Sequence, residues 1–163
     1  MASIASRPKV NPVLGLVVFV AAVAVVAVLG SLASMSAKTE YQALELPAFA
    51  PPPWLFGPVW TVLYVMIAVS GWLVWRRYGV AGAKAELGLY AVQLVLNGLW
   101  TPLFFAADLY TIALVDILLL LGVIGVLIAR FWRKDKAAAW LLVPYLVWVG
   151  YATALNAAIV VLN

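Results

Sequence analysis

The chain contains no cysteine and no histidine among its 163 residues. Without cysteine it can form no disulfide, thiolate nucleophile or iron–sulfur cluster, and without histidine it lacks an imidazole base and the commonest zinc and haem ligand. Charge is also sparse, because only 10% of the residues are charged and only six are acidic. These absences exclude most familiar catalytic constellations, and we expect no metal site.

Apolar residues, by contrast, make up 67% of the chain, and its mean hydropathy is +1.12. A soluble domain of this size would be far more polar. About 20 apolar residues are needed to cross the hydrocarbon of a bilayer, and such spans can be placed near 13–35, 57–75, 85–105, 109–129 and 138–162. The sequence therefore predicts an all-α, integral multi-pass membrane protein. We expect one domain over residues 1–163, a bundle of five transmembrane helices with a long outer loop at 36–53.

The basic residues predict how this bundle is oriented. Nine of the ten fall on one side of the five-span arrangement, namely Arg7, Lys9, Arg76, Arg77, Lys84, Arg130, Arg133, Lys134 and Lys136. Lys38 falls on the other side. Because cytoplasmic loops carry an excess of Lys and Arg, we expect the N-terminus inside and the C-terminus outside. The net charge of +4 then reflects topology and contact with anionic lipid headgroups, and no nucleic-acid partner is expected.

A rigid aromatic segment leads into the second span. Three prolines, residues 51–53, precede Trp54, and Trp60 and Tyr64 follow inside the span at a spacing that places them on one helix face. Proline lowers the entropy of a loop, and Trp and Tyr offer flat faces with one hydrogen-bonding edge each. An interfacial aromatic belt explains Trp54 but less easily the two residues inside the span. The segment therefore indicates a site for a flat ligand.

Polar side chains inside the spans are the second indication, since each costs free energy in a bilayer unless it is satisfied. In the third span, Gln93 and Asn97 share a face with Tyr90 and Trp100. A similar face of the fifth span carries Tyr145, Trp148, Ala152 and Asn156, with Thr153 beside it. The predicted topology places Trp60, Tyr64, Asn97, Trp100, Asp116, Thr153 and Asn156 in the outer half of the membrane. We expect an aromatic pocket with amide groups there, roofed by the 36–53 loop.

Each polar group also has a structural interpretation. Amides in membrane helices often only join helices, at roughly 0.6 to 2 kcal/mol per hydrogen bond. For Gln93 this role is favoured over ligand contact, and for Asn97 the two roles are equally favoured. Asp116, the only acid well inside a span, is favoured as a protonated or capped structural group over a proton relay. For Trp148 a ligand role is favoured, with core packing as the alternative.

Four segments, in order, resemble the tryptophan-rich sensory protein (TspO) family, whose animal member is the mitochondrial translocator protein. They are residues 54–64, 88–105, 114–116, and 143–148 with 152–156. The resemblance covers nearly the whole chain. It implies a five-helix membrane bundle, usually a homodimer, that binds protoporphyrin IX, haem and, in some members, cholesterol and benzodiazepine-site ligands.

Carried over residue by residue, the resemblance implies a pocket with Trp60 and Trp148 as aromatic walls. The expected ligand-binding set is Trp54, Trp60, Tyr64, Asn97, Trp100, Trp148, Ala152 and Asn156. Some bacterial members promote light-dependent breakdown of protoporphyrin IX, so Trp60 and Trp148 are also candidate catalytic residues for that photochemistry. Electron transfer from an indole needs neither His nor Cys. No covalent cofactor is expected, because the tetrapyrrole is a ligand.

The chain departs from the family pattern in two regions. The first region is the predicted outer loop at 36–53, called here the lid. It has Glu40–Tyr41 where the family usually has a Trp-Tyr pair, and its residues 46–49 read Leu-Pro-Ala-Phe where the family has Lys-Pro-x-Trp. Anchoring of porphyrin propionates by a loop lysine is therefore in doubt. After Asn156, residues 157–161 lack the tyrosine and basic residue of the animal cholesterol motif. Specific sterol binding is correspondingly less favoured.

The favoured function is a membrane receptor for protoporphyrin IX or haem, with a role in stress or pigment regulation. Sterols and benzodiazepine-site compounds are further ligand classes that the family allows. Any enzymatic activity is expected to be at most a light- and oxygen-dependent degradation of porphyrin, as a side activity. One alternative is a transporter of tetrapyrroles or lipids, although no internal repeat is visible. Another is a regulatory module that senses a ligand and acts on a protein partner. A bacterial cell membrane is the favoured location, with an outer membrane as the alternative.

Overall fold

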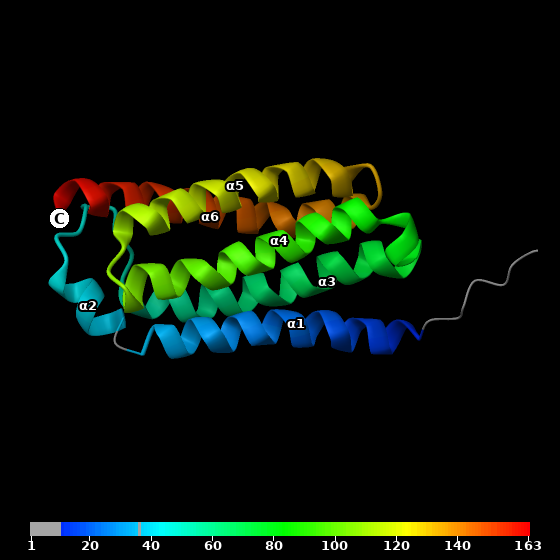
Figure 1. Cartoon of the computed structure of the whole chain (residues 1–163), viewed down its shortest axis with the longest axis horizontal. Helices are drawn as coiled ribbons and strands as arrows, with labels where there is room; N and C mark the ends of the chain where they lie inside the picture. The colour runs from blue at the N-terminus through cyan, green and yellow to red at the C-terminus, as the bar shows by residue number, and fades with distance from the viewer. Residues whose placement is uncertain (1–10, 36) are drawn as a thin grey trace, which may run out of the picture.

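The computed structural model describes residues 11–35 and 37–163, so Arg7 and Lys9 lie outside the described residues, as does the side chain of Lys38. Five long helices run side by side (Figure 1). They are α1 (Pro12–Ala33), α3 (Phe56–Gly82), α4 (Lys84–Thr101), α5 (Tyr110–Trp132) and α6 (Lys136–Leu162). All five spans are long and apolar enough to cross a membrane. The all-α, multi-pass prediction is thereby confirmed.

The element boundaries differ from the predicted spans in places. Helix α3 continues to Gly82, beyond the predicted end at Trp75, although Gly79 breaks the helical geometry with φ 66°, a conformation that glycine adopts readily. The predicted third span divides into α4 and a π-helical turn η2 (Pro102–Ala106). Within the predicted 36–53 loop lies a short helix α2 (Ala37–Ala43), and a 3₁₀ turn η1 (Pro53–Leu55) precedes α3.

The long helices close into a ring. Helix α1 packs on α3, α3 on α6, α6 on α5 and α5 on α4, and α1 also contacts α4. Short connections join α3 to α4 and α5 to α6, so these sequence neighbours are antiparallel. The buried core lies inside this ring and contains mostly aliphatic side chains from α3, α5 and α6.

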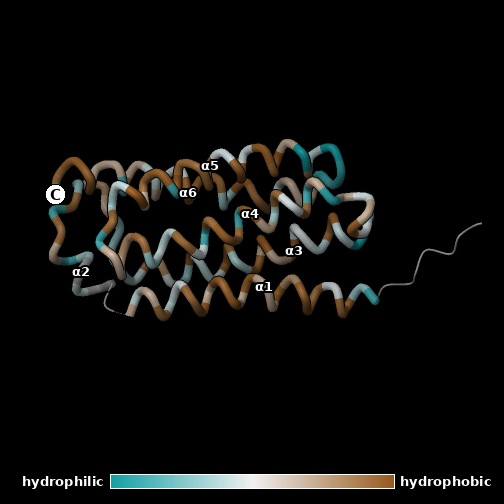
Figure 2. The backbone as a smooth tube through the Cα atoms, in the orientation of Figure 1, coloured by the Kyte–Doolittle hydropathy of each residue, from teal (hydrophilic) through white to brown (hydrophobic). Residues whose placement is uncertain are grey.

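The two ends of the bundle differ in character. One end carries α2 and the C-terminus, and we call it the lid end (Figure 1). The opposite, basic end carries the turns between α3 and α4 and between α5 and α6, where hydrophilic residues gather (Figure 2). There Arg77 forms an ion pair with Asp135 at 3.0 Å, and Lys134 Nζ donates to the Gly82 carbonyl at 2.8 Å. These contacts hold the two turns together.

In the half of the bundle near the basic end, α1 packs closely on α3 through glycines. Gly15 faces the ring of Trp75, leaving no room for a side chain. A Cβ atom at Gly71 would lie only 2.7 Å from ring carbons of Phe19 and Tyr90. Real Cβ atoms do not approach other atoms so closely, so glycine is required for this contact.

In the half near the lid end, α1 packs on α4 instead. The Cβ position of Gly30 lies 3.6 Å from the Thr101 hydroxyl, and that of Gly98 lies 3.7 Å from Val26. Both are ordinary van der Waals contacts between α1 and α4. Helix α1 therefore crosses the bundle: near the basic end it lies against both α3 and α4, where the rings of Phe19 and Tyr90 are 5.4 Å apart, and near the lid end it contacts α4.

The glycine contact gives a first prediction. Gly71→Val forces the Phe19 and Tyr90 rings to move, and overpacking of this kind destabilises a protein by about 1–3 kcal/mol. We expect a lower apparent melting temperature in detergent, followed by circular dichroism. Gly122→Val in α5 is the matched control, because no described atom other than those of the adjacent residues and the backbone of its own helix lies within 4 Å of that Cβ position. Equal melting temperatures for the two variants would contradict the packing argument.

Candidate ligand-binding site

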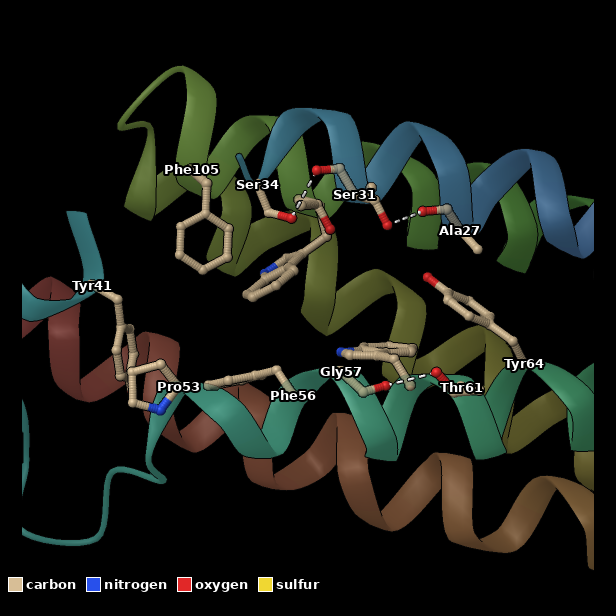
Figure 3. Close-up of a pocket in the computed structure, with 14 residues that line it drawn as sticks. Ala27, Ser31, Ser34, Tyr41, Pro53, Phe56, Gly57, Thr61, Tyr64 and Phe105 are labelled. Atoms are coloured by element: carbon tan, nitrogen blue, oxygen red, sulfur yellow. Dashed lines mark hydrogen bonds between the residues drawn. The ribbon is translucent and has the colours of Figure 1, made fainter. Parts of the chain in front are cut away.

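A cavity of about 390 Å³, called here the main cavity, lies at the lid end between α1, α3 and the end of α4. Its volume falls in the range of roughly 300–1,000 Å³ that is usual for small-molecule sites. Figure 3 shows Ser31 of α1, and Ser34 at the C-terminal cap of that helix, across the cavity from Phe56 and Thr61 of α3. The described lining residues are apolar, aromatic or hydroxyl-bearing: Ala27, Gly30, Ser31, Ser34, Tyr41, Pro53, Phe56, Gly57, Trp60, Thr61, Tyr64, Trp100, Thr101 and Phe105.

Aromatic rings on two helices form facing parts of this lining. On α3, the rings of Trp60 and Tyr64 lie 5.2 Å apart at an angle of 31°. From α4, Trp100 lines the cavity and stacks on Phe104 of η2 at 5.1 Å and 28°. The stacked pair holds the Trp100 indole in place by ring contact. The main cavity thus offers flat, pre-positioned apolar faces.

A second, much smaller cavity lies deeper in the bundle and has a volume of about 10 Å³, close to that of a single water probe. Phe56, Trp60 and Trp100 line both cavities and so form the partition between them. The remaining lining residues of the small cavity are Asn97, Ile117, Leu120, Trp148, Val149 and Ala152. Three aromatic rings therefore separate Trp148 from the main cavity.

A buried chain of hydrogen bonds starts at the main cavity. The Tyr64 hydroxyl donates to Asn97 Oδ1 at 3.1 Å, and Asn97 Nδ2 donates to the Tyr145 hydroxyl at 2.9 Å. Tyr145 in turn donates to Gln93 Oε1 at 2.9 Å. The chain joins α3, α4 and α6, as the structural interpretation of Gln93 predicts. Because both polar atoms of the Asn97 side chain have partners, its role in joining helices is met without a ligand.

Three buried polar atoms lack a hydrogen-bond partner in the described part of the chain. They are Gln93 Nε2, Asp116 Oδ2 and Trp148 Nε1. Asp116 is 7% exposed and lines neither cavity. The indole N–H of Trp148 belongs to a residue that lines the small cavity. A ligand acceptor that reached this cavity would satisfy that donor.

A second group of hydrogen bonds orients Trp100. Its indole N–H donates to Asn156 Oδ1 at 3.2 Å, and Asn156 Nδ2 donates to the Tyr110 carbonyl at 3.0 Å. Asn156 therefore links α6 to α4 and to the first residue of α5. Asn156 lines neither cavity, so it influences their shape by fixing the position of the Trp100 ring.

The lid is held down partly through Tyr41. This residue is 3% exposed, lines the main cavity and donates its hydroxyl hydrogen to the Pro51 carbonyl at 3.2 Å. Its ring meets Phe56 edge to face at 5.7 Å. Burial, with a smaller contribution from Tyr151, raises the pKa of Tyr41 to about 12. The hydroxyl therefore stays protonated, and remains a donor, throughout the physiological pH range.

Contacts to α6 hold the rest of the lid. The Tyr151 hydroxyl donates to the Phe49 carbonyl at 2.6 Å, and the two rings lie 6.2 Å apart. The backbone N–H of Glu45 donates to Asn163 Oδ1 at 3.0 Å, and Asn163 Nδ2 donates to the Glu45 carbonyl at 3.2 Å. The segment between α2 and η1 is thus tied to α6 at two places.

Comparison with known proteins agrees with this architecture. The sequence model of the TspO/MBR family matches residues 18–162. The human translocator protein is 42% identical over 118 residues, which cover 71% of this chain and 70% of that protein. The tryptophan-rich protein TspO of Archaeoglobus fulgidus is 39% identical over 130 residues, covering 80% and 84%. That of Chlorobaculum tepidum is 40% identical over 127 residues, covering 76% and 78%.

The chain belongs to the TspO/MBR family. The resemblance inferred from the four sequence segments is therefore confirmed. The five candidate spans are those of the described helices, and the residues that would contact a ligand have to be argued from the cavities of this chain.

The eight predicted ligand-binding residues of this TspO/MBR chain divide into three groups. The main cavity is lined by Trp60, Tyr64 and Trp100, of which the two tryptophans also line the small cavity. The small cavity alone is lined by Asn97, Trp148 and Ala152. Neither cavity is lined by Trp54, which is 70% exposed, or by Asn156, which holds Trp100.

Sequence reasoning missed the contribution of α1. Ala27, Gly30, Ser31 and Ser34 all line the main cavity. They follow the spacing i, i+3, i+4, i+7, which places them on one helix face. A stripe of small residues in an otherwise Val- and Leu-rich helix was the available signal. It was indistinguishable from a close-packing surface until the structure showed what faces it.

The contacts of Asn156 give a second prediction. Asn156→Leu removes two interhelical hydrogen bonds, and at roughly 1 kcal/mol each we expect the free energy of unfolding to fall by about 1–2 kcal/mol. Thr153→Val is the matched control, since the Thr153 hydroxyl bonds only to Val149 of its own helix. Denaturant unfolding in detergent measures both. A loss for Thr153→Val as large as that for Asn156→Leu would contradict the assigned role.

Proposed function

We propose that this TspO/MBR chain is a membrane receptor that binds protoporphyrin IX or a related flat tetrapyrrole in the main cavity. The observation that supports the proposal is a cavity of about 390 Å³ between the rings of Trp60 and Tyr64 on one helix and Trp100 on another. Aromatic faces gain free energy from stacking on a flat conjugated ring. The aromatic side chains would contact the flat faces of the macrocycle, so the polar substituents at the edge of the ligand would lie toward the cavity rim.

The lining favours the metal-free tetrapyrrole over haem. Iron in haem proteins takes an axial ligand from His, Cys, Met or Tyr. Among the described lining residues of the main cavity, only Tyr41 and Tyr64 are of these types, and the hydroxyl of each already donates a hydrogen bond. Haem would therefore bind here through its faces and without strong axial ligation.

The partition residues explain how Trp148 would join the site. Phe56, Trp60 and Trp100 stand between the two cavities, and rotation of these rings would merge the cavities. The ligand would then reach Trp148 and Ala152. The indole N–H of Trp148, which has no partner among the described residues, would then gain an acceptor on the ligand. This hydrogen bond would offset part of the free-energy cost of moving the three rings.

A light- and oxygen-dependent breakdown of the bound porphyrin is the catalytic part of the proposal. Trp60, with Trp148 as a second donor, would pass one electron to the light-excited ligand. Dioxygen would add across a carbon–carbon double bond of the resulting ligand radical anion and open it to two carbonyl groups, and the electron would return to the indolyl radical, so that the net change is the addition of one dioxygen to the ligand. The protein's part is to hold an indole at van der Waals distance from the ring. Trp60 is better placed for this than Trp148, because it lines the main cavity directly.

A third prediction tests binding and photochemistry together. We expect protoporphyrin IX to quench tryptophan fluorescence saturably in the dark and to lose absorbance under light in air, with Trp60→Phe abolishing the loss and Trp148→Phe reducing or abolishing it. Trp140→Phe is the matched control, since Trp140 is 60% exposed and lines neither cavity. Saturable binding without loss of porphyrin absorbance would support the receptor part of the proposal and overturn the photochemical part. Absence of saturable binding by the unaltered protein would overturn the proposed function.

The orientation and setting are also proposals. The gathering of described cations at the basic end supports a cytoplasmic position for that end and an outer position for the lid, in a bacterial cell membrane. A homodimer is expected from the family.

The orientation gives a fourth prediction. Because the chain contains no native cysteine, a single introduced cysteine is the one thiol that a maleimide can label on this chain. Ala48 in the lid and Ala85 at the start of α4 are both exposed. A membrane-impermeant maleimide added to intact cells should label Ala48→Cys and leave Ala85→Cys unlabelled until the cells are lysed. The reverse pattern would overturn the orientation.

A further inference from the structure

Among the described residues that line the main cavity, the exposed ones lie on two helices. Ser31 of α1 and Gly57 and Thr61 of α3 are exposed, whereas the other lining residues are half-buried or buried. The wall contributed by α4 contains no exposed lining residue in the described structure. The cavity therefore opens sideways, between the lid-end halves of α1 and α3. We call this opening the side slot and define it by Ser31, Gly57 and Thr61.

The crossing of α1 explains why the slot exists. Near the basic end, Gly15 and Gly71 let α1 and α3 approach closely. Toward the lid end, α1 turns to α4 and contacts it at Gly30 and Thr101. Two straight helices that touch at one end and diverge at the other leave a gap. The residues of α1 along this gap are small, so no side chain fills it.

The slot faces the bilayer. On the same helices, Val28 and Leu32 of α1 are 57% and 60% exposed, and Val62 and Val65 of α3 are 59% and 60% exposed. Aliphatic surfaces of this extent on a membrane-spanning helix are covered by lipid chains. A molecule dissolved in the lipid would therefore meet the slot directly.

The hydroxyl groups at the slot present little polar barrier. Ser31 Oγ donates to the Ala27 carbonyl at 2.8 Å, and Thr61 Oγ1 donates to the Gly57 carbonyl at 2.8 Å. Each hydroxyl is thus satisfied within its own helix. An apolar ring can pass without leaving an unpaired donor behind.

The described residues of the roof, by contrast, are held in place by hydrogen bonds. Tyr41 and Pro51 are buried, and a hydrogen bond joins them. Beyond them, Tyr151 binds the Phe49 carbonyl at 2.6 Å. Entry through the lid would break these hydrogen bonds, whereas entry through the side slot breaks none that the described residues make.

We propose that the main cavity is filled from the bilayer, through the side slot between α1 and α3, by flat apolar molecules that are dissolved in the lipid. The lid stays closed during entry. That the physiological molecule is a tetrapyrrole rests on the proposed function. The route itself is a property of this chain and can be measured with a different flat molecule.

The experiment uses Thr101→Cys, which places the single thiol of the chain on the α4 wall of the cavity. The probe is pyrene maleimide dissolved in phosphatidylcholine vesicles that contain the protein. Ser31→Phe fills the slot, and we expect it to slow labelling about tenfold, equivalent to an added barrier of about 1.4 kcal/mol. Val28→Phe is the matched control on the lipid-facing side of α1, and it should leave the rate within about twofold of the parent.

A third variant, Tyr151→Phe, loosens the lid by removing the hydrogen bond to Phe49. Entry through the side slot predicts an unchanged labelling rate for this variant. Faster labelling for Tyr151→Phe, or an unchanged rate for Ser31→Phe, would overturn the proposal. Circular dichroism and size-exclusion elution of each variant show whether it is folded. If Ser31→Phe does not fold, Thr61→Phe takes its place, because it fills the slot from the opposite helix.

The porphyrin measurement separates this inference from the proposed function. If protoporphyrin IX binds, Ser31→Phe should lower its association rate from vesicles, whereas Tyr151→Phe, at a residue that lines neither cavity, should leave that rate unchanged. Slot-dependent labelling by pyrene maleimide without porphyrin binding would overturn the proposed function and leave the route supported.

Discussion

The hydrogen-bond chain from Tyr64 through Asn97 and Tyr145 to Gln93 lies inside a membrane-spanning bundle, where an unsatisfied polar group costs free energy. Each link therefore has to be made within the protein, and this requirement sets the rotation of α4 relative to α3 and α6. With Asn97 turned toward Tyr64 and Tyr145, Trp100 lies on the same side of α4. The aromatic lining of the cavities thus follows from the need to satisfy a few amide and hydroxyl groups.

Small residues on α1 serve two purposes, and their surroundings decide which. Gly15 lies against the large ring of Trp75, so the missing side chain allows the helices to touch. Gly30 and Ser31 line the main cavity, so their small size leaves space. One helix therefore combines a tight contact near the basic end with an opening near the lid end. This combination links the fold of the bundle to the access that a ligand has to the site.

Much of the site was predictable because its signals are local. Trp60 and Tyr64 share a helix face by spacing alone, and both line the main cavity. The same reasoning placed Asn156 among the ligand contacts, yet its amide is used to hold Trp100 and the Tyr110 carbonyl. Trp54 follows the same aromatic pattern as Trp60 but is 70% exposed. Spacing identifies which residues share a face, but it does not identify what that face meets.

The sequence by itself determined the five membrane spans, because span length and apolar content follow from the thickness and chemistry of the bilayer. It also determined family membership and which end of the bundle is basic. Only the tertiary structure decided that three rings, those of Phe56, Trp60 and Trp100, divide the predicted pocket into two cavities and that α1 lines the larger one. These features depend on contacts between helices distant in sequence, and such contacts leave no periodic pattern within any one helix.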